Sequence, residues 1–158
     1  AMALTRRNPV LVLNGDSFCE IDPTRLLRFH ALKRARATIA VTHPDEREDT
    51  GSVELAEDDR ILSVVEKSGS GTIGYRNVGI YVFDRAVESL FPRNSPWSLE
   101  RDLLPRLVAQ GFYGFVTASA LYDIGTPERL AHFRNIWKEA SAYLPAAPIH
   151  HEQGSISS

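Results

Sequence analysis

The sequence predicts an α/β fold built around a mixed sheet, and three observations support this prediction. Residues 10–13 form an apolar run without alternation, which is typical of a strand covered on both faces. A helical pattern and a second apolar run, 37–41, follow in the order of a βαβ unit. From Gly51 the apolar period changes to two, which indicates antiparallel strands. One sheet with both kinds of strand pair and with helices packed on it is therefore expected.

The first third of the chain is predicted to fold as strand, helix and strand. We expect Val10–Leu13 to be a central strand of the sheet. Asp22 and Pro23 suit the N-cap and the first helical position, and apolar residues at helical spacing extend this helix to near Ala35. The short strand at 37–41 completes a crossover, for which a right-handed connection is expected.

The middle of the chain is predicted to contain a hairpin and a further buried strand. Alternating apolar residues across 53–65 flank the polar turn 57–60, which is the pattern of two antiparallel strands. Residues 78–83 form another apolar strand. Asp84 is then expected to cap a short helix that ends at Leu90.

The last third is predicted to contain two helices around one strand. Ser98 is expected to cap a helix over 99–110, and Gly111 to take the left-handed conformation at its C-terminal end. A strand follows at 112–117. The pair Thr126-Pro127 starts the last helix, whose apolar spacing continues to about Tyr143.

The composition is that of one folded domain and argues against two classes of partner. Hydrophobic residues make up 43% of the 158 residues and charged residues 24%, as in globular proteins. With 18 basic and 20 acidic side chains the net charge is -2, so neither nucleic acid nor a membrane surface is an expected partner. We expect the domain to span 8–144 and a loose polar tail to occupy 145–158.

The absence of long apolar runs and of paired cysteines favours a cytoplasmic location. No run approaches the roughly 20 residues of a membrane span. Cys19 is the one cysteine, so an internal disulfide is impossible, and its side chain is predicted to be a small buried apolar group.

Asp16 is a candidate ligand-binding residue because it lies where a buried strand ends. Asn14, Gly15 and Asp16 directly follow the first strand, and ligands bind at the carboxyl ends of strands in open α/β sheets. A simple tight turn explains the same three residues equally well. Both interpretations stay open on this segment alone.

Asp123 is a second candidate, in a similar setting. It ends an apolar stretch and precedes Gly125 and a capped helix. Helix capping is the alternative role, but Thr126 already fills it and Asp123 lies too far from the helix. We therefore expect the Asp123 carboxylate to be free for another task.

Two polar segments carry weaker signals. Glu66 and Lys67 end the second hairpin strand, and as an isolated pair they suit an exposed surface position. Residues 69–74 match the G-x-G-x-x-G pattern of dinucleotide-binding turns. That pattern needs a helix directly after the glycines, whereas a strand is predicted here, so we expect a loop without this function.

Five short segments nevertheless occur in an order that resembles one enzyme family. They are Asn14-Gly15-Asp16, Glu66-Lys67, Asn77-Val78-Gly79-Ile80-Tyr81, Ser98-Leu99-Glu100 and Asp123-Ile124-Gly125-Thr126-Pro127-Glu128. Together they resemble the sugar-1-phosphate nucleotidyltransferases over residues 8–140, and they are most similar to the branch of mannose- and heptose-1-phosphate guanylyltransferases.

The resemblance implies a fold, a reaction and roles for single residues. The implied fold is a Rossmann-like mixed sheet of the nucleotidyltransferase type. The implied reaction joins a sugar 1-phosphate to a nucleoside triphosphate and releases pyrophosphate. The implied roles are a Mg²⁺ or Mn²⁺ site at Asp16 and Asp123, contacts to sugar hydroxyls from Glu66 and Asn77, a catalytic contact to the sugar phosphate from Lys67, and a sugar pocket lined by Gly79 and Glu100.

Physical chemistry agrees with these implied roles. Mg²⁺ prefers hard oxygen ligands and usually takes one or two protein carboxylates together with substrate phosphates. Phosphoryl-type transfer requires mainly positioning and charge neutralisation. Two aspartates and a lysine are suitable for that task.

One family feature is absent from the sequence. Family members begin with a strand, a glycine-rich loop of the form G-G-x-G-T-R-L and a lysine, which bind the triphosphate; nothing like this loop precedes Asn14. We therefore expect a truncated nucleotidyltransferase fold that lacks its first strands and is inactive alone. A nucleoside triphosphate would be a partner only if the missing half is supplied.

Two further expectations follow from a truncated sheet. The strand Val10–Leu13 would expose an unpaired edge, so we expect a homo-oligomer that covers it. The alternative to an enzyme is a non-enzymatic module that binds a sugar phosphate or serves assembly.

Overall fold

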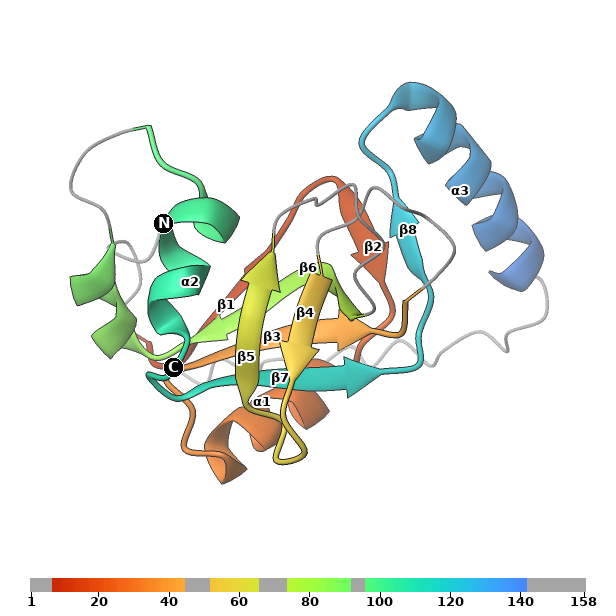
Figure 1. The fold of residues 1–158 in the computed structure, drawn as a ribbon. Coiled ribbons are helices and arrows are strands. Elements are labelled where there is room, and N and C mark those ends of the chain that lie inside the picture. Colours follow the sequence, from red (N-terminus) through yellow and green to blue (C-terminus); the bar gives the residue numbers. More distant parts are fainter. Residues whose placement is uncertain (1–6, 45–51, 66–73, 92–95, 142–158) are drawn as a thin grey trace, which may run out of the picture.

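A six-stranded mixed sheet forms the centre of the molecule (Figure 1). The computed structural model describes residues 7–44, 52–65, 74–91 and 96–141. The strands of this sheet are β1 (Val10–Leu13), β3 (Ala37–Thr42), β4 (Ser52–Leu55), β5 (Ile61–Val65), β6 (Tyr75–Phe83) and β7 (Phe112–Thr117). The predicted α/β fold with a mixed sheet is confirmed.

Strand β6 organises the sheet because it pairs along both of its edges. One edge pairs with β3, and the other pairs with β4 and then with β1, all antiparallel. β3 pairs in parallel with β7. The predicted hairpin is β4–β5, which joins the main sheet through β4. β1 and β3 run in the same direction, as in a βαβ unit, but β6 lies between them.

The prediction that Val10–Leu13 is a central strand is wrong for the described part of the chain. Within that part β1 pairs with β6 alone, along one edge. Val10 and Val12 pack against the core, while Leu11 and Leu13 are 37% and 60% exposed. The run is apolar at every position, so its sequence cannot distinguish one covered face from two.

The helical segments lie around the sheet. They are α1 (Pro23–Leu32), η2 (Arg85–Leu90), η3 (Leu99–Leu103), α2 (Leu104–Leu107) and α3 (Pro127–Ser141). No helix in the described ranges has both the length and the apolar character needed to cross a bilayer. The predicted tail at 145–158 lies outside the described residues.

Two of the helical segments begin at their predicted caps. The Asp22 carboxylate accepts a hydrogen bond from the Thr24 N–H at 2.8 Å, and Asp84 accepts one from the Ala86 N–H at 2.7 Å. α1 ends at Leu32 rather than near Ala35, because Arg34 takes a left-handed backbone conformation with φ +48°.

The helix predicted over 99–110 is shorter and irregular. Ser98 caps it as predicted, with its Oγ accepting from the Arg101 N–H at 3.3 Å. A π-helical turn, closed by the Leu104 N–H donating to the Leu99 carbonyl oxygen, precedes the single α-helical turn α2, and Pro105 in the first turn of α2 has no N–H to continue the hydrogen-bond pattern. The helix ends at Leu107, and left-handed Ala109 and Gly111, with φ +66° and +81°, lead the chain into β7.

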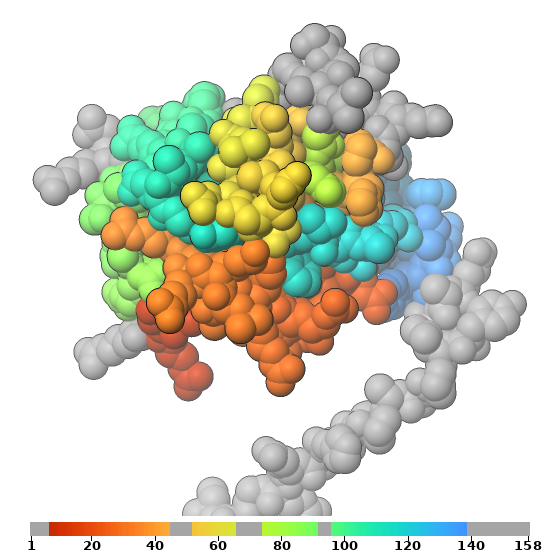
Figure 2. All heavy atoms as spheres, turned by 60° about the horizontal axis from the view of Figure 1, so that its bottom comes forward, coloured from red at the N-terminus to blue at the C-terminus, as the bar shows by residue number. Residues whose placement is uncertain are grey.

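The core lies on both faces of β3, whose six residues are all buried. On one face Ile39 and Val41 belong to a cluster that includes Leu103, Leu104 and Leu107. On the other face Phe29 of α1 packs edge-to-face against Phe115 of β7 at 5.4 Å. Figure 2, which turns the bottom of Figure 1 forward, shows the α1 segment in orange at the surface on this side of the molecule.

A second, two-stranded sheet was not predicted. It pairs β2 (Ser17–Cys19) with β8 (Leu121–Asp123) in antiparallel register. Helix α3 packs on it through aromatic rings: the centroid of Phe133 lies 4.9 Å from that of Phe18. Strands of three residues are too short to show a period of two. This small sheet joins the two segments that carry Asp16 and Asp123.

Candidate functional site

The two candidate aspartates lie at adjacent positions although they are far apart in the sequence. Asp16 directly precedes β2, and Asp123 ends β8 opposite Ser17. The Ile124 N–H donates to the Asp16 carbonyl oxygen at 2.8 Å. A Cβ placed on Gly125 would lie 3.3 Å from Asp123 Oδ1 and 3.4 Å from Asp16 Cβ. The β2–β8 pairing therefore brings both carboxylates to one end of the small sheet.

The Asp123 carboxylate is not free, in contrast to the sequence-based expectation. Its Oδ1 accepts a hydrogen bond from the Gly125 N–H at 2.9 Å. Its Oδ2 forms an ion pair with Nη1 of Arg129, in the first turns of α3. Helix capping is done by Thr126, as predicted, because its Oγ1 accepts from the Arg129 N–H at 3.3 Å. The contacts of Asp123 fix the direction in which its carboxylate points.

Asn77 is held on β6 by its own side-chain hydrogen bonds. Its Oδ1 accepts from the Gly79 N–H at 2.8 Å, and its Nδ2 donates to the Tyr81 hydroxyl oxygen at 2.8 Å. The Tyr81 hydroxyl in turn donates to Glu100 Oε1 at 2.9 Å. A chain of hydrogen bonds thus connects two predicted sugar-binding residues, Asn77 and Glu100.

Tyr81 is the centre of this network and is fully buried. Burial raises the pKa of Tyr81 well above its usual range, so the phenol stays protonated and acts as a donor. The carboxylate of Glu100, also near the Ser98 hydroxyl at 3.5 Å, is the acceptor. The position of the Glu100 side chain at the cavity wall is therefore set by its hydrogen bond to the buried Tyr81.

Gly79 is required where the β1 end passes close to β6. It has φ +75°, and a Cβ there would lie 2.8 Å from both Asn14 Nδ2 and Ser17 Oγ. The Asn14 N–H donates to the Gly79 carbonyl oxygen at 2.8 Å. Any side chain at this position would push Asn14 and the strand end away from the site.

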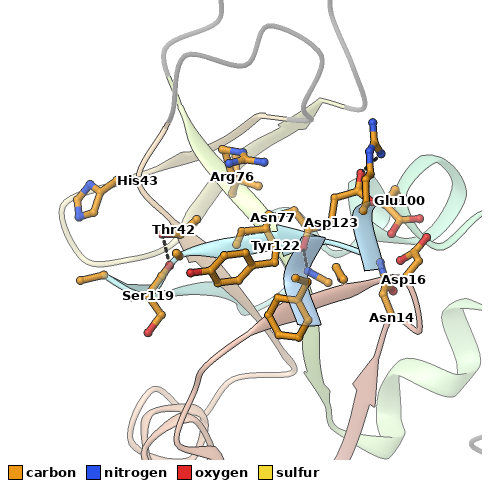
Figure 3. A pocket seen from close by; sticks show the side chains of 18 of the residues that line it. Asn14, Asp16, Thr42, His43, Arg76, Asn77, Glu100, Ser119, Tyr122 and Asp123 are labelled. Carbon is orange, nitrogen blue, oxygen red and sulfur yellow. Dashed lines mark hydrogen bonds and ion pairs between the residues drawn. The ribbon is translucent and has the colours of Figure 1, made fainter. Parts of the chain in front are cut away.

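One cavity of about 1190 Å³ brings these groups together. This is large enough for a ligand of the size of a nucleotide sugar. In the view of Figure 3, Asn14, Asp16 and Glu100 lie at one end and His43 at the other, with Asn77 and Tyr122 between them. The polar lining residues are Asn14, Asp16, Ser17, Thr42, His43, Arg76, Asn77, Glu100, Ser119, Tyr122, Asp123, Glu128, Arg129 and His132.

The donor set at Asp16 and Asp123 fits Mg²⁺ or Mn²⁺. Both residues are exposed to solvent and line the same cavity. Among the described residues no group of three or more His, Cys, Asp or Glu side chains could hold a metal ion. Two carboxylates with water and ligand phosphates are the coordination that Mg²⁺ usually adopts, and an all-protein cage is not needed.

Some predicted residues cannot be placed. Glu66 and Lys67 lie outside the described residues, as do 69–73 of the glycine-rich run. Gly74 is described, and β6 begins directly after it at Tyr75. The prediction that a strand follows these glycines is thereby confirmed, which argues against a dinucleotide-binding turn.

Sequence reasoning missed the roles of Tyr81 and Arg129. Tyr81 lies four positions after Asn77 on one strand, and this spacing places both on the same face. That signal was available. The contact of Arg129 with Asp123 had no such signal, because the intervening turn and the side-chain conformation decide it.

Comparison with known proteins gives a consistent result. The family model described as nucleotidyl transferase matches residues 1–139. A mannose-1-phosphate guanylyltransferase of Mycobacterium tuberculosis is 36% identical over 126 residues, which cover 78% of this chain and 35% of that protein. A D-glycero-alpha-D-manno-heptose 1-phosphate guanylyltransferase of Aneurinibacillus thermoaerophilus is 28% identical over 145 residues, covering 91% of this chain and 61% of that protein.

A solved structure shows the same arrangement of elements. HddC from Yersinia pseudotuberculosis superposes with a TM-score of 0.66 at 26% identity, over 84% of this chain and 56% of HddC. The chain thus spans between one third and two thirds of the length of these similar proteins.

Proposed function

The chain belongs to the nucleotidyl transferase family, and we propose that it provides the metal and sugar-phosphate side of a sugar-1-phosphate nucleotidyltransferase. Both similar enzymes reported above are guanylyltransferases, acting by name on mannose 1-phosphate and on a heptose 1-phosphate. GTP and a sugar 1-phosphate of this kind are therefore the substrates we propose for the complete active site.

The observation that carries the proposal is the shared cavity. Asp16, Asp123, Asn77 and Glu100 all line it, and the Tyr81 hydroxyl connects the last two through hydrogen bonds. Carboxylates suited to a divalent cation thus lie beside amide and carboxylate groups suited to sugar hydroxyls. A sugar 1-phosphate presents both chemistries in one small molecule.

The proposed reaction transfers a nucleotidyl group to the sugar phosphate. An oxygen of the sugar phosphate attacks the α-phosphorus of the nucleoside triphosphate, and the bond from that phosphorus to the pyrophosphate breaks. No side-chain nucleophile is needed, so the chain acts by binding and orienting the sugar phosphate. A bound Mg²⁺ would neutralise charge on the phosphate oxygens during transfer.

The sugar-binding residues are assigned on chemistry and on family resemblance. Asn77 is fixed by Gly79 and Tyr81 and would contact a sugar hydroxyl, together with Glu66. Gly79 and Glu100 would line the sugar pocket, and Lys67 would contact the sugar phosphate as a point charge. Glu66 and Lys67 lie outside the described residues, and their proposed roles rest on the family resemblance.

The metal assignment can be tested by measuring Mn²⁺ binding to the 158-residue chain by calorimetry. Asp16→Asn and Asp123→Asn should each weaken Mn²⁺ binding strongly, because one carboxylate alone is a poor site for a hard cation. Asp58→Asn, in the exposed turn between β4 and β5, is the matched control and should change nothing. Unchanged affinity in both site variants would show that the metal roles are wrong.

The enzymatic assignment needs a second assay. The 158 residues contain no G-G-x-G-T-R-L loop, so we expect pyrophosphate release from GTP and mannose 1-phosphate to stay at background with this chain alone. Addition of a polypeptide that carries the loop should restore turnover. Binding of mannose 1-phosphate without any restored turnover would instead favour a non-enzymatic binding module.

A further inference from the structure

Asp123, one of the two proposed metal ligands, already has a cationic partner within the protein, the side chain of Arg129. Nη1 of Arg129 forms an ion pair with Oδ2 of Asp123, while Oδ1 of Asp123 accepts from the Gly125 N–H. Both oxygens of this carboxylate are thus engaged by groups of the protein. A divalent cation that binds Oδ2 of Asp123 would share this oxygen with the guanidinium.

A guanidinium and a divalent cation repel each other at one carboxylate. Arginine cannot relieve this repulsion by releasing a proton, because a guanidinium stays positively charged in proteins. Movement of the Arg129 side chain away from Asp123 would relieve this repulsion when a metal ion binds. A lysine or histidine at this position could instead lose its charge.

The geometry allows the guanidinium to move without the helix. The side chains of Arg129 and Asp123 are 56% and 43% exposed, so no packed core holds the pair together. The backbone of Arg129 is fixed separately, because its N–H donates to Thr126 Oγ1 at 3.3 Å. The Leu130 N–H also donates to the Thr126 carbonyl oxygen, at 2.9 Å. Only side-chain torsions need to change.

The cavity provides the next partner for the released guanidinium. Arg129 and His132 of α3 both line it, together with the proposed metal ligands. Arginine binds phosphate with two parallel hydrogen bonds, which makes a substrate phosphate a suitable acceptor. An arginine that has just left Asp123 lies close to any phosphate bound to the metal ion on that residue.

We propose that Arg129 is an exchangeable counter-ion: it neutralises Asp123 until a divalent cation binds there, and then contacts the phosphate of the sugar substrate. This inference rests on the proposed metal site. It makes Arg129 a substrate-binding residue that couples metal binding to phosphate binding. It assigns the guanidinium two successive partners at one end of the cavity.

The first test measures Mn²⁺ affinity of the 158-residue chain without substrate. Arg129→Gln should bind Mn²⁺ about 2- to 5-fold more tightly than the wild type, the range expected when a half-exposed ion pair no longer competes. Arg134→Gln is the matched control, since it removes the same charge from an exposed position on the same helix. Its Mn²⁺ affinity should equal that of the wild type.

The second test measures mannose 1-phosphate binding at saturating Mn²⁺. Arg129→Gln should weaken this binding, and Arg134→Gln should not. An Arg129→Gln variant with unchanged or weaker Mn²⁺ binding overturns the exchange, and unchanged sugar-phosphate binding overturns the second contact.

The outcomes also separate this inference from the proposed function. If Asp16→Asn and Asp123→Asn lose Mn²⁺ binding while Arg129→Gln behaves as the wild type, only the exchange fails. If neither the wild type nor Arg129→Gln binds Mn²⁺, the metal site and the exchange both fail.

Discussion

Tyr81 shows how a residue without contact to solvent can shape the binding cavity. Its hydroxyl accepts from Asn77 Nδ2 and donates to Glu100 Oε1. Asn77 and Glu100 both line the cavity, so one buried phenol sets the orientation of two ligand-facing groups. Polar networks of this kind are rigid only when each member has its partners.

We predict that Tyr81→Phe lowers the free energy of unfolding by about 1–3 kcal/mol, because it leaves Asn77 and Glu100 without a shared partner inside the protein. Urea unfolding followed by circular dichroism measures this loss. The control is Tyr113→Phe, at a half-buried ring that contacts Lys33, with an expected change within about 0.5 kcal/mol. Equal effects of the two variants would contradict a special role for the Tyr81 hydroxyl.

Sequence reasoning located single site residues better than it described their contacts. Asp16, Asn77, Gly79, Glu100 and Asp123 were all chosen from short motifs, and all five line one cavity. Their roles in binding remain predictions. The ion pair between Arg129 and Asp123 was missed because it depends on a turn and a long flexible side chain, neither of which leaves a pattern in the sequence.

At the scale of the elements, prediction succeeded where the pattern was long and failed where it was short or ambiguous. The strand predicted at 37–41 is observed at 37–42, and the strand at 112–117 and the caps at Asp22 and Asp84 are as expected. Strands β2 and β8 have three residues each and were missed. The segment after Ser98 has good helical residues, but Pro105 breaks its hydrogen-bond pattern.

The packing of α1 on β3 includes one buried polar contact, which predicts a pH dependence. His30 is 6% exposed, and its Nδ1 lies 2.9 Å from the Thr38 hydroxyl. Burial lowers the pKa of His30 below the usual histidine value of 6.5, and the negative charge of Asp84 opposes this shift only in part. Below that value the unfolded chain binds a proton that the folded chain excludes. His30 therefore contributes its full stabilisation when the pH is above its pKa in the unfolded chain. This contribution is lost as the pH falls from that pKa toward the lower pKa of the folded protein.

We expect the wild type to lose stability as the pH falls below the ordinary histidine pKa of about 6.5, and His30→Gln to lose less over the same range. Thermal unfolding at several pH values measures both slopes. His132→Gln, at an exposed position on α3, should keep the wild-type slope. If His30→Gln also keeps that slope, the buried histidine is not the cause.

For the whole molecule, the outer edge of β1 is the feature that favours self-association. Within the described residues β1 pairs with β6 alone, and Leu11 and Leu13 are exposed. An exposed apolar edge strand readily pairs with another chain. We predict a homo-oligomer whose interface covers this edge and buries more than about 2,000 Å² in total.

Light scattering at micromolar concentration tests this prediction. Leu13→Lys should shift the protein toward the monomer, because it places a charge in the interface. Leu32→Lys, on the exposed end of α1, introduces the same charge and should leave the assembly intact. A wild-type chain that is purely monomeric would contradict the prediction.

The pairing of β2 with β8 also has a consequence for the order of folding. It joins residues 17–19 to residues 121–123, so a long stretch of chain must be organised before these two short strands can meet. Closing such a loop has an entropic cost, and pairings between distant segments slow folding. We expect the β6–β3 pairing to form earlier and the Asp16–Asp123 end to assemble last. In a stopped-flow refolding experiment, Mn²⁺ binding would then develop after the far-ultraviolet circular dichroism of the main sheet has reached its native value.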